Sequence, residues 1–400
     1  MKNINIIYKN SIKKNFNLNL SRKYTNIFNK IKLNIDKSED IFHSLSKNFN
    51  FNFKIKDLRQ FKKFKTIIVV GMGGSILGSE AIHCFLKKKI KKNVLFLNNI
   101  NQEKLKEIKN KKREKKTLFI IISKSGSTIE TLSNFFALKV IKKNSKNIII
   151  ISEKNNKSLY LISQKMKLFF IEHKKYIGGR FSVLSEVGIV PAYLMGIDIK
   201  KLRKNLLIHL NNKNKSFLRD SVIKLTSLLK KKKFKNIIFF NYVPQLNKFL
   251  YWNQQLIAES LGKNGGGFFP SISTAPKDHH SLLQLYLDGP RDKIFYIFSS
   301  DLVDKEKIII KNSIKQKKFL NKKSLSQIKK AQKNAFIKTL IEKDIPFREF
   351  TIKNYNEVTL GELFSYFILE TVIIGKLFKI NPFNQPAVEK VKTYTKNLLV

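Results

Sequence analysis

Cysteine, tryptophan and proline are scarce in this 400-residue chain, which has one cysteine, one tryptophan and eight prolines. With Cys84 alone, neither a disulfide framework nor a zinc cluster of thiolates can form. A lone cysteine suits a reducing compartment, so we expect a cytoplasmic protein in which Cys84 is a small core residue. No proline- or serine-rich linker divides the chain, and we expect its parts to pack tightly.

Acidic residues are also few, because 28 Asp and Glu stand against 79 Lys and Arg and give a formal net charge of +51. Such an excess ordinarily indicates a nucleic-acid or membrane-surface partner. The lysines, however, are spread along the whole chain, for example over residues 87–92, 230–233 and 317–323. They accompany many Asn, Ile and Phe residues, whose codons are likewise A/T-rich. We therefore expect a solvated basic surface and no specific nucleic-acid partner.

Long hydrophobic runs without charge are missing as well. The most apolar long stretch, residues 358–378, carries Glu362, Glu370 and Lys376, which favours a buried or amphipathic helix over a membrane span. Residues 1–15 alternate apolar residues with Lys and Asn and lack the continuous apolar core of a signal peptide. We therefore expect a soluble protein without a membrane partner.

What the sequence does contain is a series of short apolar runs separated by segments of helical length. The first series comprises residues 66–70, 117–122, 147–152 and 167–171, and the second comprises residues 236–241, 293–299 and 346–352. Continuous apolar strands that alternate with helices indicate parallel sheets covered on both faces. We expect an α/β protein with two doubly wound sheets.

The expected organisation begins with residues 1–60, which are polar with scattered apolar positions and predict helices packed on the outside. The other divisions are a first α/β domain over residues 61–200, a connecting helical segment over 201–235, a second α/β domain over 236–380 and a C-terminal segment over 381–400.

A glycine-rich turn over residues 71–78 follows the first predicted strand, where open α/β sheets bind ligands. Gly74 and its neighbours let the backbone bend tightly and approach a ligand closely. Taken alone, this turn fits a dinucleotide site or only a tight connection. Its spacing is not G-x-G-x-x-G, and no acidic residue ends the next strand, so we expect no nicotinamide cofactor.

A second loop, residues 123–131, combines closely spaced hydroxyls with a lysine and a glycine at a predicted helix start. A helix cap needs only one hydroxyl. The surplus of donors on Ser123, Lys124, Ser125 and Thr128 predicts a site for a phosphate dianion.

Three further groups stand out against the lysine-rich background. Arg180 follows two glycines, where a guanidinium can bridge substrate oxygens, although a tight turn with a surface arginine is the ordinary alternative. Gln255 and Glu259 are four residues apart and share one helix face, so Glu259 is either solvated or catalytic. His279 and His280 are adjacent and point in different directions, so we expect no metal site there.

Taken in order, these stretches resemble the glucose-6-phosphate isomerase family, and the resemblance runs from about residue 66 to residue 396. Its most diagnostic parts are residues 178–180, residues 255–259, His280 and the closing segment 381–392. The resemblance implies two flavodoxin-like sugar-isomerase domains, a C-terminal helix that contributes to the active site, and catalysis without cofactor or metal. It also implies a homodimer in which the histidine reaches the site of the partner subunit.

The resemblance assigns roles to individual residues. Glu259 matches the base that moves a proton between C2 and C1, and Arg180 matches the group that stabilises the charge on the intermediate. His280 and Lys392 match the pair that opens the sugar ring; we prefer His280 to His279 because the residues after it follow at the family spacing. The positions that hold the phosphate or contact the substrate are Gly74, Ser75, Ser123, Lys124, Ser125, Thr128, Gln255 and Gln385.

The activity implied is the interconversion of glucose 6-phosphate and fructose 6-phosphate, in glycolysis and gluconeogenesis, by ring opening and proton transfer through a cis-enediol. One alternative is an enzyme that also acts on mannose 6-phosphate. The isomerase half of an amidotransferase is disfavoured by the pattern from Gln385 to Lys392 and by the absence of an N-terminal glutaminase cysteine. A non-catalytic sugar-phosphate-binding protein of the same fold is a third alternative, which would need neither Glu259 nor Arg180.

Overall fold

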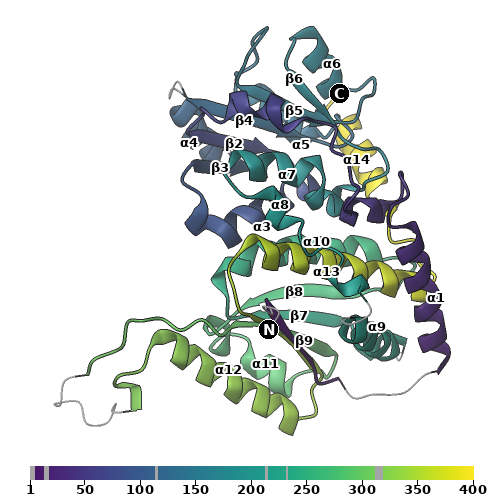
Figure 1. The fold of residues 1–400 in the computed structure, drawn as a ribbon, viewed down its shortest axis with the longest axis vertical. Helices are drawn as coiled ribbons and strands as arrows, with labels where there is room; N and C mark the ends of the chain where they lie inside the picture. Colours follow the sequence, from purple (N-terminus) through teal and green to yellow (C-terminus); the bar gives the residue numbers. More distant parts are fainter. Residues whose placement is uncertain (1–4, 13–17, 113–115, 212–214, 231–232, 311–318) are drawn as a thin grey trace.

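The computed structural model of the chain describes residues 5–12, 18–112, 116–211, 215–230, 233–310 and 319–400. Parts of the expected N-terminal extension, of the connecting segment and of the lysine runs 230–233 and 317–323 lie outside these ranges. The described chain forms two stacked α/β units with long helices between their sheets (Figure 1).

The first unit contains a five-stranded parallel sheet with the order β3-β2-β4-β5-β6. The first strand of this unit, β2, therefore has the second, β3, on one side and the third, β4, on the other, which is the flavodoxin-like arrangement. Its strands are β2 (Thr66–Val70), β3 (Asn93–Leu97), β4 (Thr117–Ile122), β5 (Ile148–Ser152) and β6 (Phe169–Glu172). Its helices are α3 (Leu77–Leu86), α4 (Gln102–Lys112), α5 (Ile129–Ala137), α6 (Ser158–Lys165) and α7 (Glu186–Leu194).

The second unit repeats this arrangement, with the order β1-β10-β9-β7-β8 and parallel pairing from β8 to β10. Its strands are β7 (Asn236–Asn241), β8 (Phe269–Thr274), β9 (Lys293–Ser300), β10 (Phe347–Ile352) and β1 (Ile6–Asn10). Its helices are α9 (Lys215–Lys230), α10 (Asn247–Leu261), α11 (Leu283–Asp288), α12 (Leu325–Glu342) and α13 (Glu357–Leu377), and α8 (Ile199–Leu202) lies between the units along the chain.

The structure confirms the predicted fold class of two parallel-sheet α/β units. All residues of β2, β4 and β5 are buried, because helices cover both faces of the sheet. Strands β3 and β8 were missed, since each contains exposed or half-buried positions that interrupt the apolar run.

The N-terminal extension differs in part from the prediction. Helix α1 (Leu18–Asn34) lies on the outside, as expected, and the short helices η1 (Ile41–Leu45) and α2 (Ile55–Leu58) follow it. The helical prediction was wrong for β1, which pairs antiparallel with β10 from Ile6↔Ile352 to Asn10↔Arg348. The physical reason is that the open edge of β10 offers unpaired backbone groups, which an extended segment can satisfy.

Two long helices, α10 and α13, pass between the sheets (Figure 1). By length and composition α13 is apolar enough to cross a membrane, but 94% of its most apolar window is buried inside the protein. It is therefore a core helix, as its charged residues Glu362 and Glu370 indicated. Helix α10 packs against α3 of the first unit and against α13 and β8 of the second, so its residues are held by both units.

Candidate active site

A close contact between two glycine-containing turns forms the floor of the site. One turn, η3 (Gly73–Ser75), follows β2, and the other, η5 (Gly179–Leu184), carries Arg180. A Cβ placed on Gly74 would lie 2.2 Å from the carbonyl carbon of Gly179, so only glycine allows this backbone contact. Gly73 has a φ of +51°, and a Cβ there would lie 2.8 Å from Nε2 of Gln255. The turn after β2 thus touches both η5 and α10.

Arg180 is the central side chain of the site and is 3% exposed. Its guanidinium donates to five acceptors: Ser260 Oγ at 2.9 Å, Glu259 Oε2 at 3.0 Å, Gln385 Oε1 at 3.2 Å, and the carbonyl oxygens of Pro382 and Asn384. Burial lowers the pKa of Arg180, and the nearby carboxylate of Glu259 acts in the opposite direction. The alternative of an ordinary surface arginine in a tight turn is therefore wrong.

Glu259 lies in the last turn of α10, and both of its carboxylate oxygens are held. Gln255, one helical turn earlier, donates from Nε2 to Oε1 at 2.9 Å, and Arg180 donates to Oε2. The indole N–H of Trp252 also donates to the backbone carbonyl of Arg180 at 3.1 Å, which fixes the helix against the turn. The side chain of Glu259 remains 31% exposed. The carboxylate is thus oriented and still accessible to a ligand.

The second predicted loop follows β4 and starts α5. Thr128 occupies the N-cap position of α5, yet its side chain makes no capping hydrogen bond. Its hydroxyl instead lies 2.9 Å from the hydroxyl of Ser123, and Ser125 Oγ accepts from the backbone N–H and the hydroxyl of Ser127, both at 3.3 Å. Helix capping therefore does not explain these hydroxyls.

The backbone of this loop is as constrained as that of the first turn. Gly126 has a φ of +70°, and a Cβ there would lie 2.9 Å from Ser152 Oγ. Lys124 donates to the carbonyl oxygen of Lys175 at 2.9 Å and lies 3.6 Å from Glu153. Burial lowers the pKa of Lys124, while Glu153 raises it. The lysine is held at the carboxyl edge of the sheet by these contacts.

Neighbouring strands bring the two loops together. Strands β2 and β4 pair in parallel, with Val70 opposite Ile121, so residues 71–75 and 123–128 emerge side by side at one edge of the sheet. A Cβ on Gly71 would lie 3.0 Å from the carbonyl oxygen of Ile122. Ser75 is half-buried at this edge. The expected phosphate positions therefore adjoin the turn that touches Gln255.

The structure does not bring the two expected ring-opening residues into this cluster. His280 is exposed and follows η8 (Lys277–His279), beyond the carboxyl end of β8. Lys392 is exposed on α14 (Ala387–Asn397) and pairs with Glu389 at 2.7 Å. His279, in contrast, hydrogen-bonds the Tyr242 hydroxyl at 2.7 Å, and burial lowers its pKa.

Several participants were not identified from the sequence. Arg180 is held by the hydroxyl of Ser260 and by the backbone carbonyl oxygen of Pro382. The only sequence signals for these two residues were the position of Ser260 next to Glu259 and the position of Pro382 within the closing segment. Among the described residues, no group of three His, Cys, Asp or Glu side chains is placed to hold a metal ion.

Comparisons with known proteins show the family of the chain. Residues 40–399 match the family model described as phosphoglucose isomerase. The chain is 34% identical to the glucose-6-phosphate isomerase of Methanocaldococcus jannaschii over 343 residues, which is 82% of this chain and 83% of the relative. It is 32% identical to the glucose-6-phosphate isomerase of Campylobacter jejuni over 349 residues, which is 84% of this chain and 85% of the relative.

Solved structures show the same fold at lower identity. A crystal structure of a hypothetical protein from Thermus thermophilus has a TM-score of 0.83 at 22% identity and covers 99% of this chain and 100% of its own. A crystal structure of a glucose-6-phosphate isomerase from Chlamydia trachomatis has a TM-score of 0.75 at 16% identity, covering 99% and 88%.

The close backbone contact between Gly74 and Gly179 can be tested by substitution. We expect Gly74→Ala to destabilise the protein by about 1–3 kcal/mol, because its methyl group must push η3 away from the backbone of Gly179. Gly179→Ala is the matched control, since the nearest atom to its Cβ, the Cα of Gly74, lies at an ordinary 3.8 Å. Urea denaturation of both variants gives the answer. Equal losses of stability in the two variants would contradict the close-contact interpretation.

Proposed function

Because the chain belongs to the phosphoglucose isomerase family, it interconverts glucose 6-phosphate and fructose 6-phosphate, and we propose that Glu259 is the single base of that reaction. The observation that carries the proposal is the carboxylate of Glu259, which Gln255 and Arg180 orient from both sides while 31% of the side chain stays exposed.

The isomerisation moves one proton between adjacent carbons. A base removes the proton from C2 of the open-chain aldose, the electrons form a C1–C2 double bond, and O1 gains a proton to give a cis-enediol. The base then returns its proton to C1 while O2 loses its proton and becomes the ketone. One carboxylate above the C1–C2 edge serves both carbons, so a second base is unnecessary. Glu259 suits this task because Gln255 and Arg180 fix its orientation.

Arg180 supplies a fixed positive charge beside the base. Negative charge develops on the sugar oxygens as the C2 proton leaves, and a preorganised cation stabilises it without reorganising solvent. The guanidinium is immobile because Ser260 and two backbone carbonyl groups hold it in addition to Glu259. We propose that Arg180 faces the developing enediolate and that Gln385, which already contacts it, binds substrate hydroxyls.

The phosphate group binds several bonds away from the reacting carbons. We propose that Ser75, Ser123, Ser125 and Thr128 donate hydrogen bonds to it and that Lys124 provides charge. These residues share one edge of the first sheet, where a dianion also meets the start of α5. Binding energy gained there holds C1 and C2 in register with Glu259, which lowers the barrier to proton transfer.

Ring opening is assigned to His280 and Lys392. Imidazole titrates near neutral pH and can protonate the ring oxygen. His280 lies outside the Arg180–Glu259 cluster of its own chain and is exposed, which supports a role in the site of a second subunit. We therefore propose a homodimer in which each chain lends its histidine to its partner. Lys392 lies on the exposed α14, seven residues after Gln385, and we propose that it acts from the same chain.

Glu259→Gln tests the proton shuttle. We expect turnover of fructose 6-phosphate to fall by about a thousandfold, because an amide cannot accept the C2 proton. Binding of sorbitol 6-phosphate, which lacks a carbonyl and cannot react, should stay close to that of the unmodified protein. A coupled assay and calorimetry measure the two quantities. Turnover near the unmodified rate would show that another group is the base.

Mixing two inactive variants tests the shared histidine. In a hybrid of His280→Asn and Glu259→Gln subunits, one site receives an intact Glu259 and an intact His280 only if the histidine crosses to the partner. Random exchange makes half of the dimers hybrids with one working site, so activity should return to about a quarter of the unmodified value. If mixing restores nothing although the subunits exchange, His280 acts within its own chain.

A further inference from the structure

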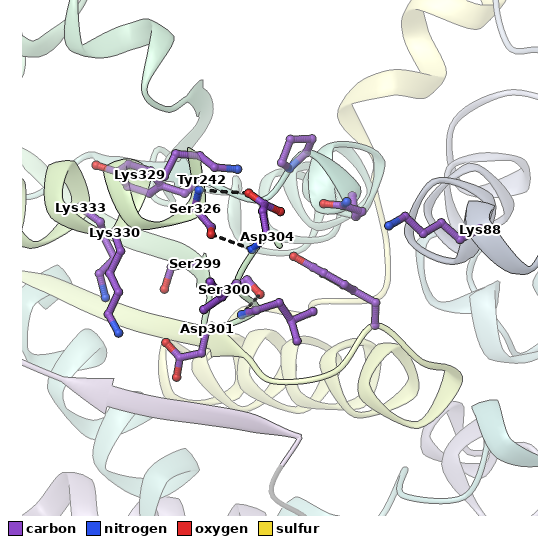
Figure 2. Close-up of a pocket in the computed structure, with 15 residues that line it drawn as sticks. Lys88, Tyr242, Ser299, Ser300, Asp301, Asp304, Ser326, Lys329, Lys330 and Lys333 are labelled. Atoms are coloured by element: carbon purple, nitrogen blue, oxygen red, sulfur yellow. Dashed lines mark hydrogen bonds between the residues drawn. The ribbon is translucent and has the colours of Figure 1, made fainter. Parts of the chain in front are cut away.

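A cavity of about 400 Å³ lies at the second sheet, apart from the Arg180–Glu259 cluster. Its lining includes Tyr242, which follows β7, and Ser299 and Ser300, which end β9 (Figure 2). None of the lining residues is among those assigned above to catalysis or to the phosphate loop. Its volume falls in the range of about 300–1,000 Å³ that small-molecule sites occupy.

The place of this cavity in the fold corresponds to that of the phosphate loop. In the first sheet the second strand, β3, lies on one side of β2 and the third strand, β4, lies on the other. The second sheet repeats this with β8 and β9 on either side of β7. Ligands bind α/β sheets at such a switch point, beyond the carboxyl ends of the strands. The gap between β2 and β4 holds residues 71–75 and 123–128, and the gap between β7 and β9 holds the cavity.

The cavity is positively charged, because four lysines and two aspartates line it. Lys329, Lys330 and Lys333 project from α12 on one side, and Lys88 of the first unit lies on the opposite side (Figure 2). Within the described part of the chain, neither Lys88 nor Lys329 has an ion-pair partner at 4.0 Å or less. Two cations are therefore free to bind an anion.

The acidic groups of the cavity are already engaged. Asp301 pairs with Lys353, and Lys330 and Lys333 also act on its charge. The carboxylate of Asp304 accepts the backbone N–H of Ser326 at 3.0 Å. Lys333 also lies 3.4 Å from Glu349, a carboxylate outside the cavity that partly neutralises its charge. These contacts leave the positive charge of Lys88 and Lys329 uncompensated.

Hydroxyl groups complete the lining. Ser299 lies 3.3 Å from the Thr351 hydroxyl, and Ser300 Oγ accepts the N–H of Leu302 at 3.1 Å, so each hydroxyl keeps spare hydrogen-bonding capacity. Tyr242 and Tyr355 add two phenol groups. Serine hydroxyls and aromatic rings suit a polyhydroxylated ligand, whereas lysines suit its phosphate.

We propose that this cavity is a second, non-catalytic site for a small phosphorylated sugar. Pro244 and Gln245 line the cavity immediately before α10, and Glu259 lies near the other end of that helix. Because α10 has 15 residues, about 20 Å separates the two ends. One chain therefore holds two ligands at once, one at each switch point.

Equilibrium dialysis with labelled sorbitol 6-phosphate at physiological salt tests the proposal. We expect two molecules to bind each chain of the unmodified protein. Lys329→Gln with Lys330→Gln should weaken the second site by about tenfold or more, because hydrogen bonds to charged groups are stronger than neutral ones. The same variant should keep its turnover of fructose 6-phosphate. Ser123→Ala with Thr128→Ala should instead weaken binding at the first site and raise KM. The loss of one site can therefore be distinguished from the loss of the other.

The matched control removes one lysine toward the other end of α12 and one immediately after it, Lys338→Gln with Lys343→Gln, neither of which lines the cavity. We expect it to keep both sites. The proposal is overturned if the unmodified protein binds one molecule per chain, if the control loses the second site equally, or if binding rises without saturation. Inorganic phosphate or AMP binding the second site as tightly as sorbitol 6-phosphate would overturn the assignment to a sugar.

Discussion

The contact between Arg180 and Glu259 is the interaction on which the rest of the site depends. A buried guanidinium is stable only where acceptors surround it, and here Ser260, Gln385 and two backbone carbonyl groups supply them together with the carboxylate. Removing any of these partners leaves buried donors unsatisfied. The chain thus gathers η5, the end of α10 and the segment around residues 382–385 around one side chain. That arrangement keeps Glu259 oriented while part of its surface stays open to a ligand.

The fold makes this contact possible by placing one helix against both units. Helix α10 belongs to the second sheet, yet it packs on α3 and touches the turn after β2 through Gln255. The backbone contact between Gly74 and Gly179 then brings Arg180 to the end of that helix. The proposed base comes from one unit and the proposed phosphate loop from the other, so the site forms only while the two units remain packed. One continuous apolar core, which includes residues of both sheets, secures that packing.

Much of this was predictable from the sequence, and the exceptions have physical causes. Fully buried strands such as β2, β4 and β5 appear as nearly continuous apolar runs. Strand β1, in contrast, is held by backbone pairing with β10, which leaves no such pattern in its side chains. Arg180 and Gln255 contact Glu259 directly and Gln385 contacts Arg180, so the structure brings together four residues that the resemblance had singled out. The carbonyl acceptors of Pro382 and Asn384 were not foreseen, since any residue carries a carbonyl group. The cavity beside Lys329 depends on tertiary packing, and among so many lysines no local pattern marked it.

A crystal structure of the protein with sorbitol 6-phosphate in the first site tests the role of Glu259 most directly. We expect the phosphate to contact Ser123 and Thr128 and the carboxylate of Glu259 to lie within about 3.5 Å of C1 and C2. A ligand bound in the reverse direction, or a Glu259 that still points away from both carbons when the site is occupied, would contradict it.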